Sequence, residues 1–218
     1  MMIRKNINLL ILSLFTLVVS ISILKIVFTP MRDYGLFLSG LYNILSNYIF
    51  LLSILGFSLF LYEIKKNKYY FIILSIFFSV FILTQISFNI ILELIFYHKL
   101  DLIFGFDKFP LTILYLLNIC IGFLLWFIPF KNLVKYLITI IFSFVSSMNI
   151  GLNDIEVFSI KSFANYPGGN VFILVMLIGL FLYLFKLINR KYINIGSKIF
   201  GSWMVVISLI SCIFSLIY

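Results

Sequence analysis

The chain has 218 residues, of which 64% are hydrophobic and 11% are charged, and its formal net charge is +9. Soluble domains contain about 45–50% apolar and about 25% charged residues, so this composition excludes a soluble globular protein. The basic residues lie in short connections between apolar segments, which excludes a nucleic-acid-binding surface as the reason for the positive charge. We predict an all-α integral membrane protein that forms a single multi-pass domain over residues 1–218.

Seven apolar segments are long enough to cross a hydrocarbon core, which needs about 17–25 residues. We predict membrane spans over 8–29, 41–62, 70–97, 111–130, 133–150, 171–188 and 200–217. The first segment follows the basic stretch IRKN, as the apolar part of a signal peptide would. It contains Lys25 and lacks a small-residue cleavage site, so we expect it to be retained as a span.

The basic residues are distributed unequally between the two sides of this threading. One side holds Arg4, Lys5, Lys65, Lys66, Lys68, Lys131, Lys135, Lys186, Arg190, Lys191 and Lys198. The other side holds Lys25, Arg32, Lys99, Lys108 and Lys161. The positive-inside rule therefore places the N-terminus in the cytoplasm and the C-terminus outside. We expect an integral protein of a bacterial cytoplasmic (inner) membrane, with the lipid bilayer as its first partner and no nucleic acid.

Polar side chains gather in the outer halves of the predicted spans. Gln85, Asn89 and Glu93 are four residues apart on the third span, and each step of four drifts by about 40°, so all three share one face of a helix. Asn43 and Asn47 share a face of the second span in the same way. The predicted ligand-binding set is Gln85, Asn89, Glu93, Asn43, Asn47 and Asn118.

The acidic residues show the same asymmetry. The acids on the predicted outer side are Asp33, Glu93, Asp101, Asp107, Asp154 and Glu156. An acid in a span costs roughly 2.5–3.5 kcal/mol on insertion scales and usually faces the bundle interior or a wet cavity. We therefore predict a polar cavity between spans two to five that opens to the outside. Two alternatives stay open: Glu93 as an interfacial anchor paired with Lys99 or His98, and Gln85 and Asn89 as interhelical hydrogen-bonding residues.

Two further features favour a structural role. The stretch YPGGN before the sixth span predicts a turn, because Pro167 fixes φ and Gly168 can adopt the positive φ of a type II turn. A stripe of small residues on the last span predicts close helix packing, with a membrane-protein partner as one alternative. The stripe consists of Gly201, Ser208, Ser211 and Ser215.

The favoured functional hypothesis is a transporter or permease-type component whose polar cavity binds a ligand, with Glu93 as a site for a cation or a proton. Two features typical of transporters are missing from the sequence, namely a clear inverted repeat and a helix broken by Gly or Pro in mid-span. The first alternative is a non-catalytic subunit, assembly factor or immunity-type protein that packs on a partner.

The second alternative is an enzyme of the outer leaflet that acts on a lipid or lipid-linked substrate. Its bases or metal ligands would be the loop acids Asp33, Asp101 and Asp154. The sequence contains no catalytic motif, so an enzyme is the less favoured hypothesis. The chain has one histidine and two cysteines without metal-ligand spacing, so we predict no metal site and no cofactor.

Overall fold

The computed structural model describes residues 35–64, 67–88, 91, 111–126, 132–150 and 160–217. The regular secondary structure within these ranges is helical throughout, which confirms the predicted all-helical class. The helices are α2 (Leu36–Ser46), α3 (Tyr48–Tyr62), α4 (Asn67–Ile86), α7 (Leu111–Leu124), α8 (Asn132–Ile150), α9 (Ile160–Leu187) and α10 (Arg190–Ile217). Helices satisfy their backbone hydrogen bonds internally, which is what an apolar chain needs in lipid.

Four stretches of helix are long and apolar enough to cross a membrane, namely Tyr69–Ile86, Asn132–Ile150, Asn165–Leu187 and Arg190–Ser215. The bent pair α2 and α3 makes a fifth span if the two helices are counted as one. The apolar part of α7, Thr112–Leu124, is shorter. The predicted span over 8–29 lies outside the described residues, so the count of seven spans stays a prediction.

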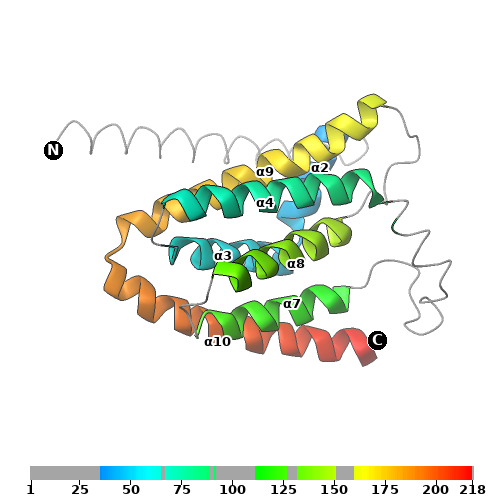
Figure 1. The fold of residues 1–218 in the computed structure, drawn as a ribbon. Helices are drawn as coiled ribbons and strands as arrows, with labels where there is room; N and C mark the ends of the chain where they lie inside the picture. The colour runs from blue at the N-terminus through cyan, green and yellow to red at the C-terminus, as the bar shows by residue number, and fades with distance from the viewer. Residues whose placement is uncertain are drawn as a thin grey trace.

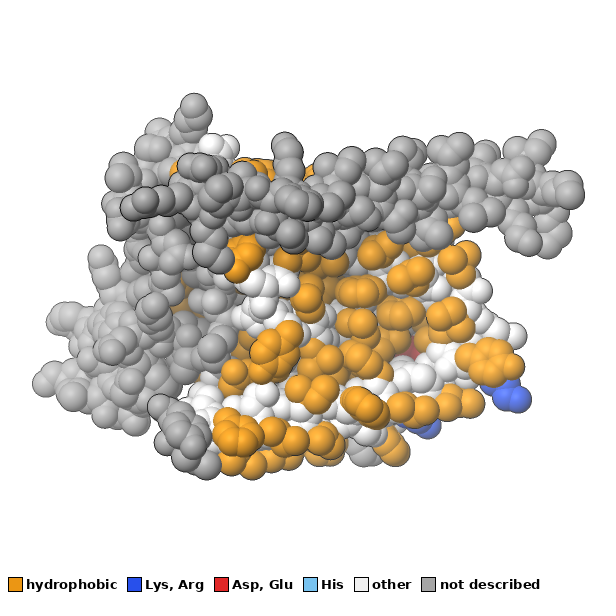
Figure 2. Space-filling model, turned by 180° about the vertical axis from the view of Figure 1, so that it is seen from behind, with side chains coloured by type: hydrophobic (Ala, Val, Ile, Leu, Met, Phe, Trp, Pro, Cys, Tyr) orange, Lys and Arg blue, Asp and Glu red, His pale blue; other side chains and the backbone are white. Residues whose placement is uncertain are grey.

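The outer faces of the helices are apolar. Leu133, Phe71 and Trp203 are each about two-thirds exposed. Figure 2 shows hydrophobic side chains over much of the described part of one face of the bundle, and the described Lys and Arg side chains visible in this view lie at one end of it. Apolar helices with this distribution of side chains fit a protein embedded in a lipid bilayer.

The helices lie side by side in a bundle (Figure 1). Helices α3, α7 and α9 end at the same side of the bundle at which α4, α8 and α10 begin. We call this side the basic end, because Lys186, Arg190, Lys191 and Lys198 lie at or near the connection between α9 and α10. The alternating directions agree with the predicted threading of these six helices. The cytoplasmic location of the basic end stays a prediction.

Aromatic stacking and hydroxyl groups join α3, α4 and α8. The Phe57 ring stacks on Phe142 with centroids 4.6 Å apart, and on Phe77 with centroids 4.9 Å apart. Ser143 Oγ donates to the Phe77 carbonyl oxygen at 2.5 Å, and Ser147 Oγ donates to the Phe81 carbonyl oxygen at 2.9 Å. Both residue pairs advance by four, so one helical turn of α8 matches one turn of α4 and sets their register.

Glycines allow α7 and α10 to pack closely. A Cβ atom on Gly122 would lie 2.7 Å from the Gly201 carbonyl oxygen, and a Cβ on Gly201 would lie 2.7 Å from the Gly122 carbonyl oxygen. Further along, Ser215 Oγ lies 3.3 Å from Thr112 Oγ1. The small-residue stripe of α10 therefore packs closely, as predicted, but against α7 of the same chain. A membrane-protein partner would need another face of α10.

Several helix boundaries differ from the predicted spans. α9 begins at Ile160 instead of 171, and α10 begins at Arg190 instead of 200, so only residues 188 and 189 separate them. α7 ends at Leu124 instead of 130. α9 and α10 begin earlier because polar residues can extend a helix beyond the apolar part that a hydropathy criterion finds. α7 ends earlier although the following residues are apolar, and Pro129 disfavours a helical continuation there.

The YPGGN stretch lies inside α9, so the predicted turn is wrong. Pro167 removes one backbone N–H from the helix and leaves one carbonyl, four residues earlier, without its usual donor. A turn in apolar surroundings would leave more backbone groups without partners. Pro167 and Gly169 are also buried, and Gly169 packs directly on the backbone of Phe37 in α2. Tertiary contacts therefore favour the continuous helix.

Candidate functional site

A break in the second predicted span forms one wall of the candidate site. The span over 41–62 was predicted as one continuous helix, and this is wrong, because α2 and α3 meet at an angle of 78°. Asn47 lies between them with φ −91° and ψ 97°, outside the helical region. Its Oδ1 accepts a hydrogen bond from the Phe50 backbone N–H at 3.1 Å. Asparagine is among the best N-cap residues, and here it starts a new helix.

Asn43 of α2 joins three helices near this break. Its Nδ2 donates to Tyr166 Oη of α9 at 2.7 Å and to the Ile150 carbonyl oxygen at 2.9 Å. Ile150 is the last residue of α8, and the last carbonyls of a helix have no partner within it. The Asn43 amide therefore satisfies a helix end and fixes the position of α2.

Gln85 of α4 joins three helices as well. Its side chain is fully buried. Gln85 Nε2 donates to the Ser147 carbonyl oxygen at 3.1 Å, and Gln85 Oε1 accepts from Asn170 Nδ2 at 3.4 Å. The interhelical hydrogen bonding considered for Gln85 is thus present, and it connects α4 to α8 and α9.

The sequence analysis missed two residues of this cluster, Tyr166 and Asn170. Tyr166 is 1% exposed and Asn170 is 0% exposed. Both belong to the YPGGN stretch, which was assigned to a turn and given no functional weight. Their spacing of four residues places them on one face of α9, and the same spacing had singled out Gln85 and Asn89. A signal was therefore present in the sequence.

Several buried oxygens of α8 and α9 have no hydrogen-bond partner within the described part of the chain. They are Asn170 Oδ1, Asn149 Oδ1 and Ser146 Oγ. Leaving a buried acceptor unpaired costs about 1–3 kcal/mol. Asn170 Oδ1 lies beside Gly40, at 3.1 Å from where a Cβ on that glycine would be. Asn170 Oδ1 therefore marks a position beside Gln85 that can accept a hydrogen bond or coordinate a cation.

We define the amide cluster as Asn43, Gln85, Ser147, Tyr166 and Asn170, which the hydrogen bonds described above connect to one another or to the end of α8. Its residues come from α2, α4, α8 and α9, and none of them carries a formal charge. The cluster therefore offers neutral oxygen ligands and amide donors beside a broken helix.

Two other predicted site residues have different roles. Asn47 caps α3 as described above, so its side chain does not share a helical face with Asn43. Asn118 of α7 is fully buried, and its Nδ2 donates to the Ile49 carbonyl oxygen of α3 at 3.4 Å. Among the described residues, no hydrogen bond joins Asn118 to the amide cluster, and its Oδ1 has no partner.

The remaining predicted site residues, Asn89 and Glu93, lie outside the described residues. The loop acids of the enzyme hypothesis, Asp33, Asp101 and Asp154, lie outside them too. Of the six predicted ligand-binding residues, the structure brings Asn43 and Gln85 into one cluster, each through α9.

Comparisons of the chain with protein-family models, with curated proteins and with solved structures find no match. The function is therefore inferred from the chemistry of the site.

Proposed function

We propose that the protein is a multi-pass membrane transporter or permease-type component, and that its outward-facing polar cavity is built around the amide cluster. The observation that carries this proposal is the 78° break between α2 and α3 beside buried amides. Non-helical backbone at membrane depth is tolerated where it is buried in protein or lines a water-filled cavity. Transporters typically bind substrates and ions at such discontinuous helices.

The chemistry of the cluster favours a small monovalent cation as a ligand. α2 ends at Ser46 beside the break, and the C-terminal end of a helix carries partial negative charge. The unpaired oxygens of Asn170, Asn149 and Ser146 are neutral acceptors. In broken-helix transporters, unwound carbonyls and helix C-terminal ends bind Na⁺ or H⁺. Glu93 would supply a negative charge at the outer end of the predicted third span, the span that carries Gln85.

Charge movement tests this proposal. Proteoliposomes are adsorbed on a solid-supported membrane and exposed to separate concentration jumps of Na⁺, K⁺ and H⁺. We expect a transient current with at least one of these ions for the native protein. Asn170→Leu should abolish the current, because it removes both the unpaired oxygen and the amide that contacts Gln85.

Asn165→Leu is the matched control, since it makes the same chemical change at an exposed position of α9 and should leave the current unchanged. If the native protein gives no current with any of the three ions, or if Asn170→Leu conducts normally, the transport proposal is wrong.

Cysteine labelling tests the direction in which the cavity opens. In a background with Cys120→Ser and Cys212→Ser, Asn170→Cys should react with a membrane-impermeant thiol reagent added at the side opposite the basic end. Asn170 is fully buried in this structure, so the reaction requires the cavity to open, and no reaction from either side would contradict the proposed cavity. Ser197→Cys, at the basic end, should react from the other side only. Reaction of Asn170→Cys from the basic side alone would overturn the outward-facing orientation.

A further inference from the structure

A cavity lies at the basic end of the bundle, away from the amide cluster. It has a volume of about 250 Å³, and it lies where α3 and α7 end and α10 begins. The lining residues are Glu63, Leu125, Trp126, Asn194, Ile195, Ser197 and Lys198. Glu63 follows the last residue of α3, whereas the break beside the amide cluster precedes its first residue, so α3 separates the two (Figure 1).

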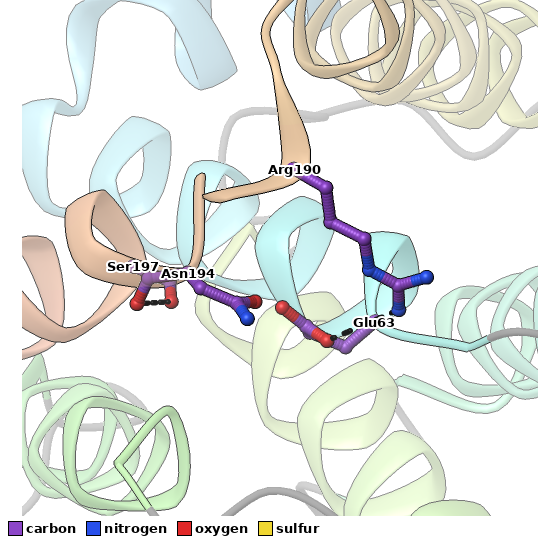
Figure 3. A network of polar contacts seen from close by, with 4 residues as sticks. All are labelled: Glu63, Arg190, Asn194 and Ser197. Atoms are coloured by element: carbon purple, nitrogen blue, oxygen red, sulfur yellow. Dashed lines mark hydrogen bonds and ion pairs between the residues drawn. The ribbon is translucent and has the colours of Figure 1, made fainter. Parts of the chain in front are cut away.

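The charges around this cavity leave an excess of positive charge. Glu63 Oε2 lies 3.9 Å from Arg190 Nη2, so an arginine already balances the acid. Figure 3 shows the Asn194 side chain pointing toward the Glu63 carboxylate, with Ser197 one turn further along α10. Lys198 adds a second positive charge to the lining. The Ser197 hydroxyl donates to the Asn194 carbonyl oxygen of its own helix at 3.1 Å, so the Lys198 ammonium is the charged donor that suits a phosphate ester.

An apolar groove continues from this cavity. It has a volume of about 370 Å³, and it is lined by Phe123, Trp126, Ser202, Val205 and Val206. Trp126 lines both spaces. Along α10, the polar lining at 194–198 is followed by the groove lining at 202–206, and the groove therefore runs away from the basic end.

A polar, positively charged cavity joined to an apolar groove matches an amphiphile with an anionic head and a hydrocarbon tail. Basic pockets between transmembrane helices bind lipid head groups, and tryptophan favours the membrane interface. We propose that this composite site binds an anionic phospholipid from the leaflet at the basic end. The phosphate lies at Lys198, and one acyl chain lies along Val205 and Val206. A free phosphate ion would leave the apolar groove without an occupant.

The two tryptophans of the chain allow a direct test in the full-length protein. Trp203→Phe leaves Trp126 as the only tryptophan, inside the composite site. Trp126→Phe leaves Trp203, which is 65% exposed and does not line either space. Each variant is reconstituted with brominated phosphatidylglycerol or brominated phosphatidylcholine. The quenching of its tryptophan fluorescence by the brominated chains gives the relative affinity of each lipid for the surroundings of that tryptophan.

We expect Trp126 to show about a fivefold preference for phosphatidylglycerol, as expected for one lysine acting on an anionic head group. Trp203 should show no preference. Adding Lys198→Gln to the Trp126-only protein should reduce the preference to about one, whereas Lys191→Gln, which removes the same charge outside the lining, should keep it.

The groove is tested in the same Trp126-only protein. Val206→Phe should reduce the quenching of Trp126 by filling the groove, whereas Ile210→Phe, one turn further along α10, should not. Equal preference at both tryptophans would show general charge attraction and overturn the site. The site would also be overturned if zwitterionic and anionic lipids quenched Trp126 equally. The same holds if Lys191→Gln reduced the phosphatidylglycerol preference as strongly as Lys198→Gln.

Discussion

Replacing Gly169 by alanine is expected to destabilise the folded protein by about 3 kcal/mol, the upper part of the usual range for overpacking. The Cβ atom would collide with the backbone carbonyl of Phe37 in α2. On the other helix, a Cβ on Gly40 would lie 2.6 Å from the Tyr166 carbonyl oxygen. Backbone atoms cannot rotate away as a side chain can, so α2 and α9 must separate in either variant.

Gly168 is the matched control for this experiment. It lies in the same helix, next to Gly169, and a Cβ there would meet no atom within 4 Å. Gly168→Ala should therefore stabilise the protein slightly, by up to ~1 kcal/mol, because alanine favours a helix more than glycine does. Free energies of unfolding measured in mixed micelles or bicelles compare the variants. If Gly168→Ala and Gly169→Ala had equal effects, the close packing of α2 on α9 would be refuted.

The second large effect is expected at the contact between Gln85 and Asn170. Gln85→Leu leaves the Ser147 carbonyl and the Asn170 amide without this partner, and each buried group left unpaired costs about 1–3 kcal/mol. Asn170→Leu removes the same contact from the other side and also replaces an oxygen that has no partner among the described residues. We therefore expect Gln85→Leu to be the more destabilising single change.

A double-mutant cycle isolates the interaction between the two side chains. Both single variants break the same contact. The double variant Gln85→Leu/Asn170→Leu should therefore lose less free energy of unfolding than the two single variants together, by about 0.5–1 kcal/mol. The measurement is again the free energy of unfolding. Additive losses would mean that the 3.4 Å contact contributes nothing to stability, and that the amides lie together for another reason.

These stability measurements also separate structure from function. A variant that unfolds normally but carries no current identifies a residue that contacts the ligand. A variant that loses stability and current together identifies a residue that supports the site. Asn170 combines a paired Nδ2 with an unpaired Oδ1, so the comparison is most informative there.

Much of the helical pattern follows from composition and periodicity. The prediction of a span over 133–150 matches α8 (Asn132–Ile150) almost residue for residue. Four hydroxyl residues of that span, Thr139, Ser143, Ser146 and Ser147, are buried, as expected for a face that meets other helices. Gln85 was singled out because of its apolar surroundings, and it is fully buried in contact with two other helices. A polar group within an apolar helix has few favourable positions other than the bundle interior, so its burial can be predicted locally.

The amide cluster itself depends on contacts that no local pattern contains. Asn43 and Tyr166 are separated by 123 positions in the chain, and their 2.7 Å hydrogen bond exists only because α2 packs on α9. The break at Asn47 depends on a competition between a continuous helix and a capped new one. Hydropathy alone does not detect this competition, because the residues on both sides of Asn47 are predominantly apolar.

The sequence alone therefore decides that the protein is a set of apolar helices with polar faces, since burial and helical period are properties of each segment. The tertiary structure decides which polar faces meet. It also decides that YPGGN continues α9 as a helix, although its local chemistry favours a turn. The physical reason is that hydrogen bonds and close backbone contacts between helices outweigh local turn preferences when little water is present to satisfy the backbone.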